Sequence, residues 1–167
     1  NEQDLLEDAE CLTVSPTRTW SWGVYAMGSL SNDAAELPLP KRRHMLSFRL
    51  RTIEPFDFGQ PVVLNAGTIR SAVGQILEAA HVRPYRTYYE EPPSTGRNTY
   101  RWGNVEGMCF TPDGSSLLLG MRNPLCDDSA ILVVVQGVAE ALRAGDSGLF
   151  RVTDVFGLDL GARGVSD

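Results

Sequence analysis

Two glutamates stand at the start of two similar segments, and their carboxylates are the groups in this chain best suited to chemistry. Glu10 opens the segment Glu10–Pro16 and Glu106 opens the segment Glu106–Pro112. In both, the Glu is followed by small and apolar residues, a hydroxyl residue and a proline. Two carboxylates held by equivalent strands can bind a divalent cation through oxygen ligands, and calcium suits such ligands best. We therefore predict that Glu10 and Glu106 are metal ligands and ligand-binding residues.

Four further residues extend this candidate site. Arg122 and Asn123 follow an apolar run that ends in glycine, and Arg163 stands close to Asp159 in the sequence. An arginine donates two parallel hydrogen bonds to a phosphate or carboxylate, so these residues would suit an anionic substrate. The alternative is structural: Glu106 and Arg122 form an ion pair that ties one sheet to its neighbour.

The other groups of potentially functional residues give weaker evidence of a site. His44 and His81 are the only histidines, and no G-x-S-x-G motif is present, so a Ser-His-Asp nucleophilic site is not predicted. The basic run Lys41–His44 is read as a solvated loop. Five aromatic residues cluster around Glu90 and Glu91, either as an interaction loop or as a loop packed over the sheets: Tyr85, Tyr88, Tyr89, Tyr100 and Trp102.

The elements that must position these residues follow an internal repeat. Each glutamate segment is followed by an apolar run ending in glycine, a polar loop, a third strand-like run and a fourth. Thr111–Gly114 carries a proline and a glycine in a strong turn signal. Repeated units of four short strands are typical of β-propeller blades. The runs are Val24–Gly28, Met45–Leu50 and Pro61–Leu64 in the first unit, and Leu117–Gly120, Ala130–Val135 and Phe150–Val152 in the second.

Two segments interrupt the strand pattern. Apolar residues recur every three or four positions over Ile69–Val82, which predicts a helix outside the sheets. A shorter helix is expected over Val138–Ala144, ending at Gly145, and Arg83–Arg101 reads as a long irregular loop. We predict an all-β fold with a helical insert, a partial β-propeller made of two four-stranded blades of a larger ring. The divisions are 1–65 for the first blade, 66–103 for the helix and loop, and 104–167 for the second blade.

Several motifs resemble those of bacterial β-propellers of the domain-of-unknown-function 3616 family. The resemblance rests on Asn104–Met108, Leu118–Leu125, Ala130–Val133, Leu158–Asp167 and, in the first unit, Asp8–Leu12 and Gly28–Ser31. This chain departs from the family at Cys11, where glycine is usual, and at Leu30, where histidine is usual. The resemblance implies a propeller related to phytase-like and esterase-like propellers, and it transfers no catalytic residues.

Composition narrows the class of protein. The chain has 167 residues, 15 Lys plus Arg, 21 Asp plus Glu and a net charge of −6, which argues against a general nucleic-acid binder. No apolar stretch is long enough to span a bilayer. The three cysteines, Cys11, Cys109 and Cys126, lack metal-site spacing and are expected to be buried reduced thiols. No signal peptide is visible, so a cytoplasmic location is expected.

Two functions from different classes follow. The first is a propeller-based binding or protein-interaction module of unknown ligand, within a longer protein or a multi-chain assembly. The second is a calcium-dependent phosphoesterase-like or esterase-like hydrolase with carboxylates at the propeller channel. Two blades cannot close a ring, because propellers have about four to eight. The expected partner is therefore further polypeptide, either the rest of the propeller or another chain.

Overall fold

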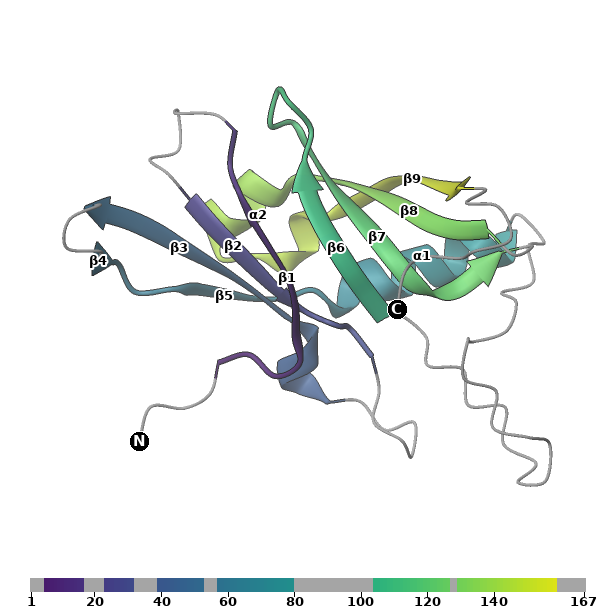
Figure 1. Ribbon diagram of the computed structural model, residues 1–167, viewed down its shortest axis with the longest axis horizontal. Helices are drawn as coiled ribbons and strands as arrows, with labels where there is room; N and C mark the ends of the chain where they lie inside the picture. The colour runs from purple at the N-terminus through teal and green to yellow at the C-terminus, as the bar shows by residue number, and fades with distance from the viewer. Residues whose placement is uncertain are drawn as a thin grey trace.

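The described part of the chain folds as two antiparallel β-meanders that pack against each other, with two α-helices (Figure 1). The computed structural model describes residues 5–16, 23–31, 39–52, 57–79, 104–126 and 129–158. The mostly β architecture with helical insertions confirms the predicted fold class at this level. A closed ring is not part of the described structure, and the division of the chain into three parts stays a prediction.

The first sheet begins with β1 (Ala9–Val14), β2 (Gly23–Gly28) and β3 (His44–Thr52), each antiparallel to the next. Two short strands share its last position. β5 (Val62–Asn65) pairs with the first half of β3, and β4 (Asp57–Phe58) pairs with its end. The 3-10 helix η1 (Pro40–Arg43) leads directly into β3. The runs predicted in the first unit therefore coincide with β2, β3 and β5, except that Pro61 precedes β5.

The second sheet is a regular meander of four strands in chain order, β6 (Asn104–Phe110), β7 (Ser116–Cys126), β8 (Ser129–Gln136) and β9 (Arg151–Leu158). The predicted turn at Thr111–Gly114 joins β6 to β7, and Gly114 has the positive φ of 71° that favours glycine. The turn is held by Asp113, whose Oδ1 accepts hydrogen bonds from the Thr111 hydroxyl at 2.6 Å and the Ser115 backbone at 3.1 Å.

The core lies between the two sheets. Side chains alternate across a strand, so every second residue of each sheet faces the other sheet. The first sheet contributes Tyr25, Met27, Met45 and Leu64, all buried. The second contributes a larger aliphatic set: Val105, Leu117, Leu119, Met121, Ile131, Val133 and Val135. The ring of Tyr25 meets that of Phe110 edge to face, with centroids 4.9 Å apart, so the sheets are in direct contact.

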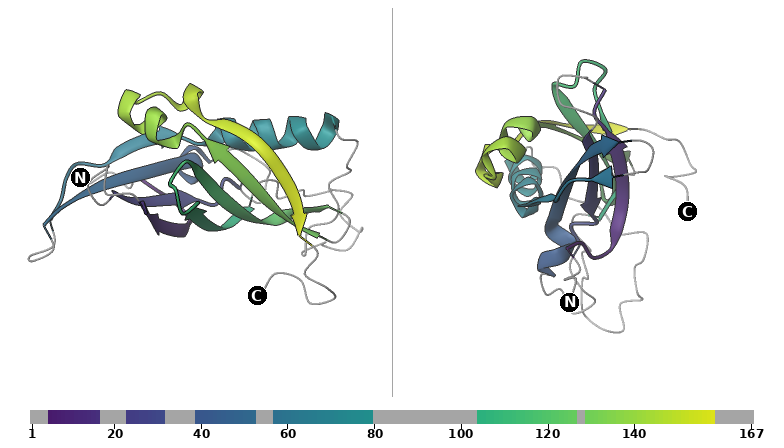
Figure 2. Two further views of the ribbon diagram at one scale, coloured as in Figure 1. Left: turned by 90° about the horizontal axis from the view of Figure 1, so that it is seen from above. Right: turned by 90° about the vertical axis from the view of Figure 1, so that its left-hand side faces the viewer.

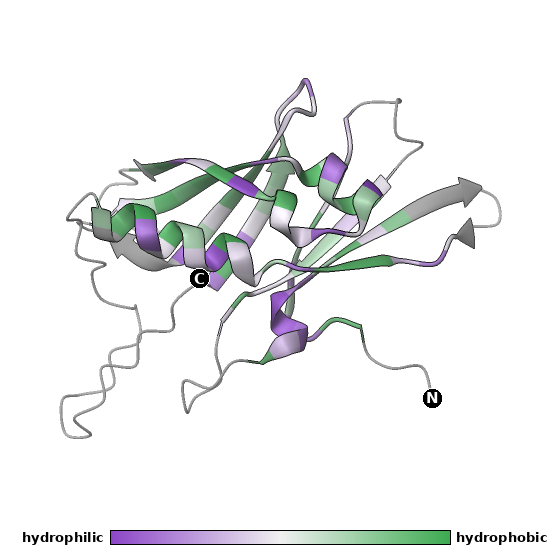
Figure 3. Cartoon of the chain, turned by 180° about the vertical axis from the view of Figure 1, so that it is seen from behind, coloured by the Kyte–Doolittle hydropathy of each residue, from purple (hydrophilic) through white to green (hydrophobic). Residues whose placement is uncertain are grey.

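The helices close the side of this core that lies away from β1 and β6. α1 (Gly67–Ala79) buries Ile69, Val73 and Leu77, the residues whose spacing predicts a helix. It begins two residues before the predicted start, where the Gly67 N–H donates to Asn65 Oδ1 at 2.8 Å. α2 (Val138–Ala144) has the predicted bounds. Figure 2 shows both helices on one side of the strands, and Figure 3 shows them from behind with apolar and polar residues alternating along α1.

Two of the local predictions are wrong. Cys109 is exposed rather than buried, because it lies on the face of β6 that points away from the core. The basic run at Lys41–His44 is not a solvated loop: it forms η1 and the start of β3, and the guanidinium of Arg42 bonds to neighbouring side chains.

Within the described ranges, no helix is long and apolar enough to cross a membrane.

Candidate functional site at the β1–β6 seam

The first strands of the two sheets lie side by side, and we call the line along which they meet the β1–β6 seam (Figure 1). The Val105 N–H donates to the Ser29 carbonyl oxygen at 2.9 Å, which joins the second sheet to the end of β2 in the first. The outer strands of the sheets are separated by the core and the helices. The arrangement therefore brings Glu10 of β1 and Glu106 of β6 to one place, as the sequence predicts.

Both glutamates occupy a break in the strand register. Ala9 pairs with Gly28 and Cys11 with Met27, so Glu10 is the extra residue between two consecutive pairs. In the same way Val105 pairs with Met121 and Gly107 with Gly120, which leaves Glu106 as the extra residue. Such β-bulges bend a strand and redirect a side chain, and they are common beside functional sites. The two carboxylates therefore have equivalent positions in their sheets.

The register corrects one detail of the sequence alignment. The sequence alone aligns the apolar runs of the second strands by their final glycines, Gly28 and Gly120. In the structure Gly28 lies opposite Ala9, whereas Gly120 lies opposite Gly107. Ala9 is the counterpart of Val105, because each is the residue just before its bulged glutamate. Gly28 pairs with Ala9 and Met121 pairs with Val105, so the counterpart of Gly28 is Met121 and not Gly120. The strands correspond, but the glycines are offset by one residue.

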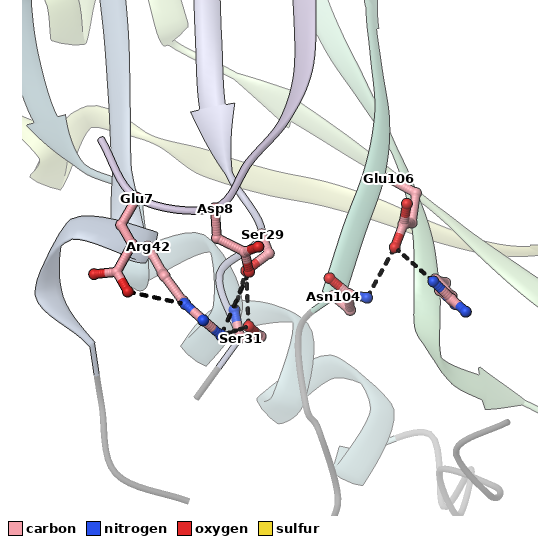
Figure 4. A network of polar contacts seen from close by, with 8 residues as sticks. Glu7, Asp8, Ser29, Ser31, Arg42, Asn104 and Glu106 are labelled. Atoms are coloured by element: carbon pink, nitrogen blue, oxygen red, sulfur yellow. Dashed lines mark hydrogen bonds and ion pairs between the residues drawn. The ribbon is translucent and has the colours of Figure 1, made fainter. Parts of the chain in front are cut away.

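Glu106 is held by two neighbours in its own sheet. Its Oε1 accepts a hydrogen bond from Asn104 Nδ2 at 2.9 Å and lies 3.4 Å from the Arg122 guanidinium nitrogen (Figure 4). The predicted structural pair of Glu106 with Arg122 therefore forms. It links β6 to β7 within the second sheet, however, and does not tie one sheet to its neighbour as expected.

Glu10 lies in a more negative environment than Glu106. Partial burial raises the pKa of Glu10, and the nearby carboxylates of Glu106 and Asp8 raise it further, while Arg122 lowers it. Among the described residues, no salt bridge to Glu10 is found. The negative charge of Glu10 also acts on the next residue. The pKa of the Cys11 thiol is raised to about 12, mainly by burial and then by the charge of Glu10. The seam therefore carries an excess of negative charge at Glu10.

A polar network beside the seam was not predicted from the sequence. The Ser29 hydroxyl, fully buried, donates to Asp8 Oδ2 at 2.7 Å and lies 2.7 Å from the Ser31 hydroxyl. The Arg42 guanidinium reaches Ser31 Oγ at 3.1 Å and Asp8 Oδ2 at 3.4 Å, and its Nε lies 3.7 Å from Glu7 (Figure 4). The hydroxyls are fully engaged and buried, so this network positions β1, β2 and η1 rather than offering a nucleophile.

The backbone around this network is unusual at two residues. Asp8 and Leu30 have positive φ values of 57° and 62°, a region that non-glycine residues rarely adopt. A Cβ on Gly28 would lie 2.5 Å from the Arg42 carbonyl oxygen, so only glycine fits there. Leu30, which stands where the resembled family usually has histidine, is buried in the core and donates its N–H to the Arg42 carbonyl at 2.9 Å.

The remaining predicted residues are not placed at the seam by the described structure. The backbone of Asn123 pairs with Asn104 in the register of β6 and β7, but its side chain lies outside the described residues. Asp159, Arg163, His81 and the aromatic cluster of 85–102 lie outside them as well. His44 contacts the segment before β1, where its Nδ1 lies 2.7 Å from the Leu5 carbonyl oxygen.

The carboxylates at the seam are few for a calcium site. Calcium takes six to eight oxygen ligands, including several carboxylates. Within the described ranges, no group of three or more Asp, Glu, His or Cys side chains is placed to hold a metal ion. Glu106 is also already engaged by Asn104 and Arg122. The described residues therefore fall short of a calcium site, and Glu10 and Glu106 as metal ligands stay a prediction.

Comparison of the chain with protein-family models, curated proteins and solved structures finds no match. The resemblance to the domain-of-unknown-function 3616 propellers therefore stays a prediction.

Proposed function

We propose that this chain is part of a propeller-like binding module that presents a ligand or partner site at the β1–β6 seam. The observation that supports this best is the equivalent placement of Glu10 and Glu106 in bulges of the two adjacent first strands. A rigid sheet on each side of the seam would hold the two carboxylates in a fixed relation, as a binding site requires.

The charge at the seam favours a cationic ligand group over the anionic one expected from the sequence. The guanidinium of Arg122 is engaged by Glu106, and that of Arg42 lies beside Glu7 and Asp8. Glu10 is the carboxylate that gains most from a new positive partner, because Glu106 and Asp8 both oppose its ionisation. A guanidinium or ammonium group placed beside Glu10 would relieve this repulsion through a charge-assisted hydrogen bond. The ligand class is thus an arginine or lysine side chain of a partner, or a small organic cation.

Calorimetric titration with Nα-acetyl-arginine amide tests this function. We expect Glu10→Gln to weaken binding about tenfold, which corresponds to about 1.4 kcal/mol for a charge-assisted hydrogen bond. Arg122→Gln is expected to tighten binding, since it frees the Glu106 carboxylate. Glu140→Gln is the matched control, because it removes the same charge from an exposed position on α2. Equal affinity in all four proteins, or no binding, would overturn the proposal.

The calcium-dependent hydrolase is the second candidate. It is favoured by the mutual repulsion of Glu10 and Glu106, which a divalent cation would also relieve. It needs ligands beyond the described donor set, so we place it below the binding module. A thermal-shift measurement with calcium chloride separates the two: stabilisation by calcium that disappears in Glu106→Gln supports the hydrolase, and indifference to calcium supports the binding module.

A further inference from the structure

The two sheets do not use the same face to contact each other. Matching the strands by their bulges makes Leu12 and Val14 of β1 equivalent to Met108 and Phe110 of β6. Met108 and Phe110 pack against the core between the sheets. Leu12 and Val14 point away from that core and are 67% and 53% exposed. At its first strand, this face of the four-stranded unit is thus covered in the second sheet and exposed in the first, whereas Ala26 and Leu46 farther along the same face of the first sheet are buried.

The opposite face shows the reverse relation. Met45 of β3 and Leu64 of β5 are buried against the second sheet. By register their equivalents are Leu132 of β8 and Phe156 of β9, which pair with each other on the outer side of the second sheet. Phe156 is 50% exposed, and Leu158 two residues later on the same face is 40% exposed. The face that the first sheet uses in the core is therefore exposed at β9 in the second sheet, although Ala130 on β8 is buried there.

We call the face that carries Leu12 in the first sheet and Met108 in the second the front of each unit, and the opposite face the back. The contact between the sheets is heterologous, because the back of the first unit meets the front of the second. A heterologous contact leaves one unused front and one unused back, and these two unused surfaces match each other. Here the unused surfaces are the outer face of the first sheet, with Leu12 and Val14, and the outer face of the second sheet, with Leu132, Phe156 and Leu158. Exposed large apolar residues gathered on a sheet face are a common mark of an interaction surface.

We propose that the chain stacks head to tail on a second copy of itself. The outer face of the second sheet in one copy packs on the outer face of the first sheet in the next, and this contact repeats the one already made inside the chain. The occupant follows from that continuity, because the second copy carries the same kind of four-stranded face that covers Met108 and Phe110 internally. Leu12 and Val14 share β1 with Glu10, but stacking is measured by mass and ligand binding by affinity, so the two proposals can fail independently.

Light scattering on the size-exclusion peak tests this stacking with one variant on each face. Leu12→Asp places a charge on the outer face of the first sheet, and Phe156→Asp places one on the outer face of the second sheet. Both side chains are exposed enough for the fold to persist. We expect the unmodified chain to elute as an oligomer and each variant alone to have the 18.3 kDa mass of one chain. An equimolar mixture of the two variants is expected to form a two-chain complex, since one variant keeps the face that the other needs.

Leu5→Asp is the control, since Leu5 is 39% exposed and precedes β1 outside either sheet. Circular dichroism checks the fold, and Val14→Asp and Leu158→Asp replace either variant that fails to fold. A monomeric unmodified chain would overturn the proposal. Variants that each still form a dimer, or that do not combine when mixed, would overturn the head-to-tail geometry.

Discussion

Glu10 shows how a residue's surroundings change what its type alone would suggest. In the folded chain its carboxylate is partly buried and lies near Glu106 and Asp8, which raises its pKa above the ordinary 4.5. The native state therefore binds this proton more tightly than the unfolded state does. The stability that Glu10 contributes is full below pH 4.5 and declines as the pH rises through the raised pKa.

Replacing Glu10 by Gln removes this pH-dependent loss. We expect Glu10→Gln to be more stable than the unmodified chain at pH 7, by less than about 1 kcal/mol because the site is close to solvent. The difference should vanish as the pH falls below 4.5. Urea unfolding of both proteins between pH 4 and pH 7.5 measures it, with Glu140→Gln as a control that should show no such trend. A constant difference across this range would contradict the account.

A second prediction about single residues concerns the reactivity of the thiols of Cys11 and Cys109. Burial and the charge of Glu10 raise the pKa of Cys11 to about 12, whereas Cys109 is exposed. Alkylation requires the thiolate, so iodoacetamide at pH 8 should modify Cys109 in the native chain and Cys11 only after unfolding. Peptide mass spectrometry after timed quenching gives both rates. Equal rates at the two positions would show that Cys11 is not shielded.

At the scale of the elements, η1 and the end of β2 are locked together by a close backbone approach. A Cβ on Gly28 would lie 2.5 Å from the Arg42 carbonyl oxygen, and the neighbouring Leu30 N–H bonds to the same oxygen. We expect Gly28→Ala to destabilise the chain by about 1–3 kcal/mol, the usual cost of overpacking. Gly107→Ala is the matched control, because a Cβ there meets no atom within 4 Å. Urea midpoints give both values, and similar midpoints for the two variants would contradict this packing.

The elements themselves could be predicted because their signals are local. The four-residue spacing of Ile69, Val73 and Leu77 predicts α1, and the turn chemistry at Thr111–Gly114 predicts the β6–β7 hairpin. Interactions between distant segments could not be predicted in the same way. Arg42 reaches Asp8 across 34 positions of sequence, and nothing in the basic run around it indicates that partner. The glycine offset between Gly28 and Gly120 likewise depends on where the bulges fall, which only the pairing reveals.

At the scale of the whole molecule, the meeting of β1 and β6 determines both the candidate site and the open surfaces. The sequence predicts that Glu10 and Glu106 are equivalent, and the register places both in bulges at the seam. It does not predict that the Arg122 pair stays within the second sheet or that Asp8 adds to the charge around Glu10. These depend on how the two sheets pack, a property of the assembled core rather than of any one strand.

The central claim is that Glu10 and Glu106 share one electrostatic environment at the β1–β6 seam. The most direct test is the pKa of the Glu10 side-chain carboxyl, followed by carbon-detected NMR in the unmodified chain and in Glu106→Gln. We predict that this pKa lies above its ordinary value in the unmodified chain and falls in Glu106→Gln, because a nearby negative charge is removed and Arg122 is freed. The same pKa should fall when Nα-acetyl-arginine amide is added to the unmodified chain. A Glu10 pKa that is ordinary in the unmodified chain and unchanged in Glu106→Gln would show that the two glutamates do not meet, and would contradict the account.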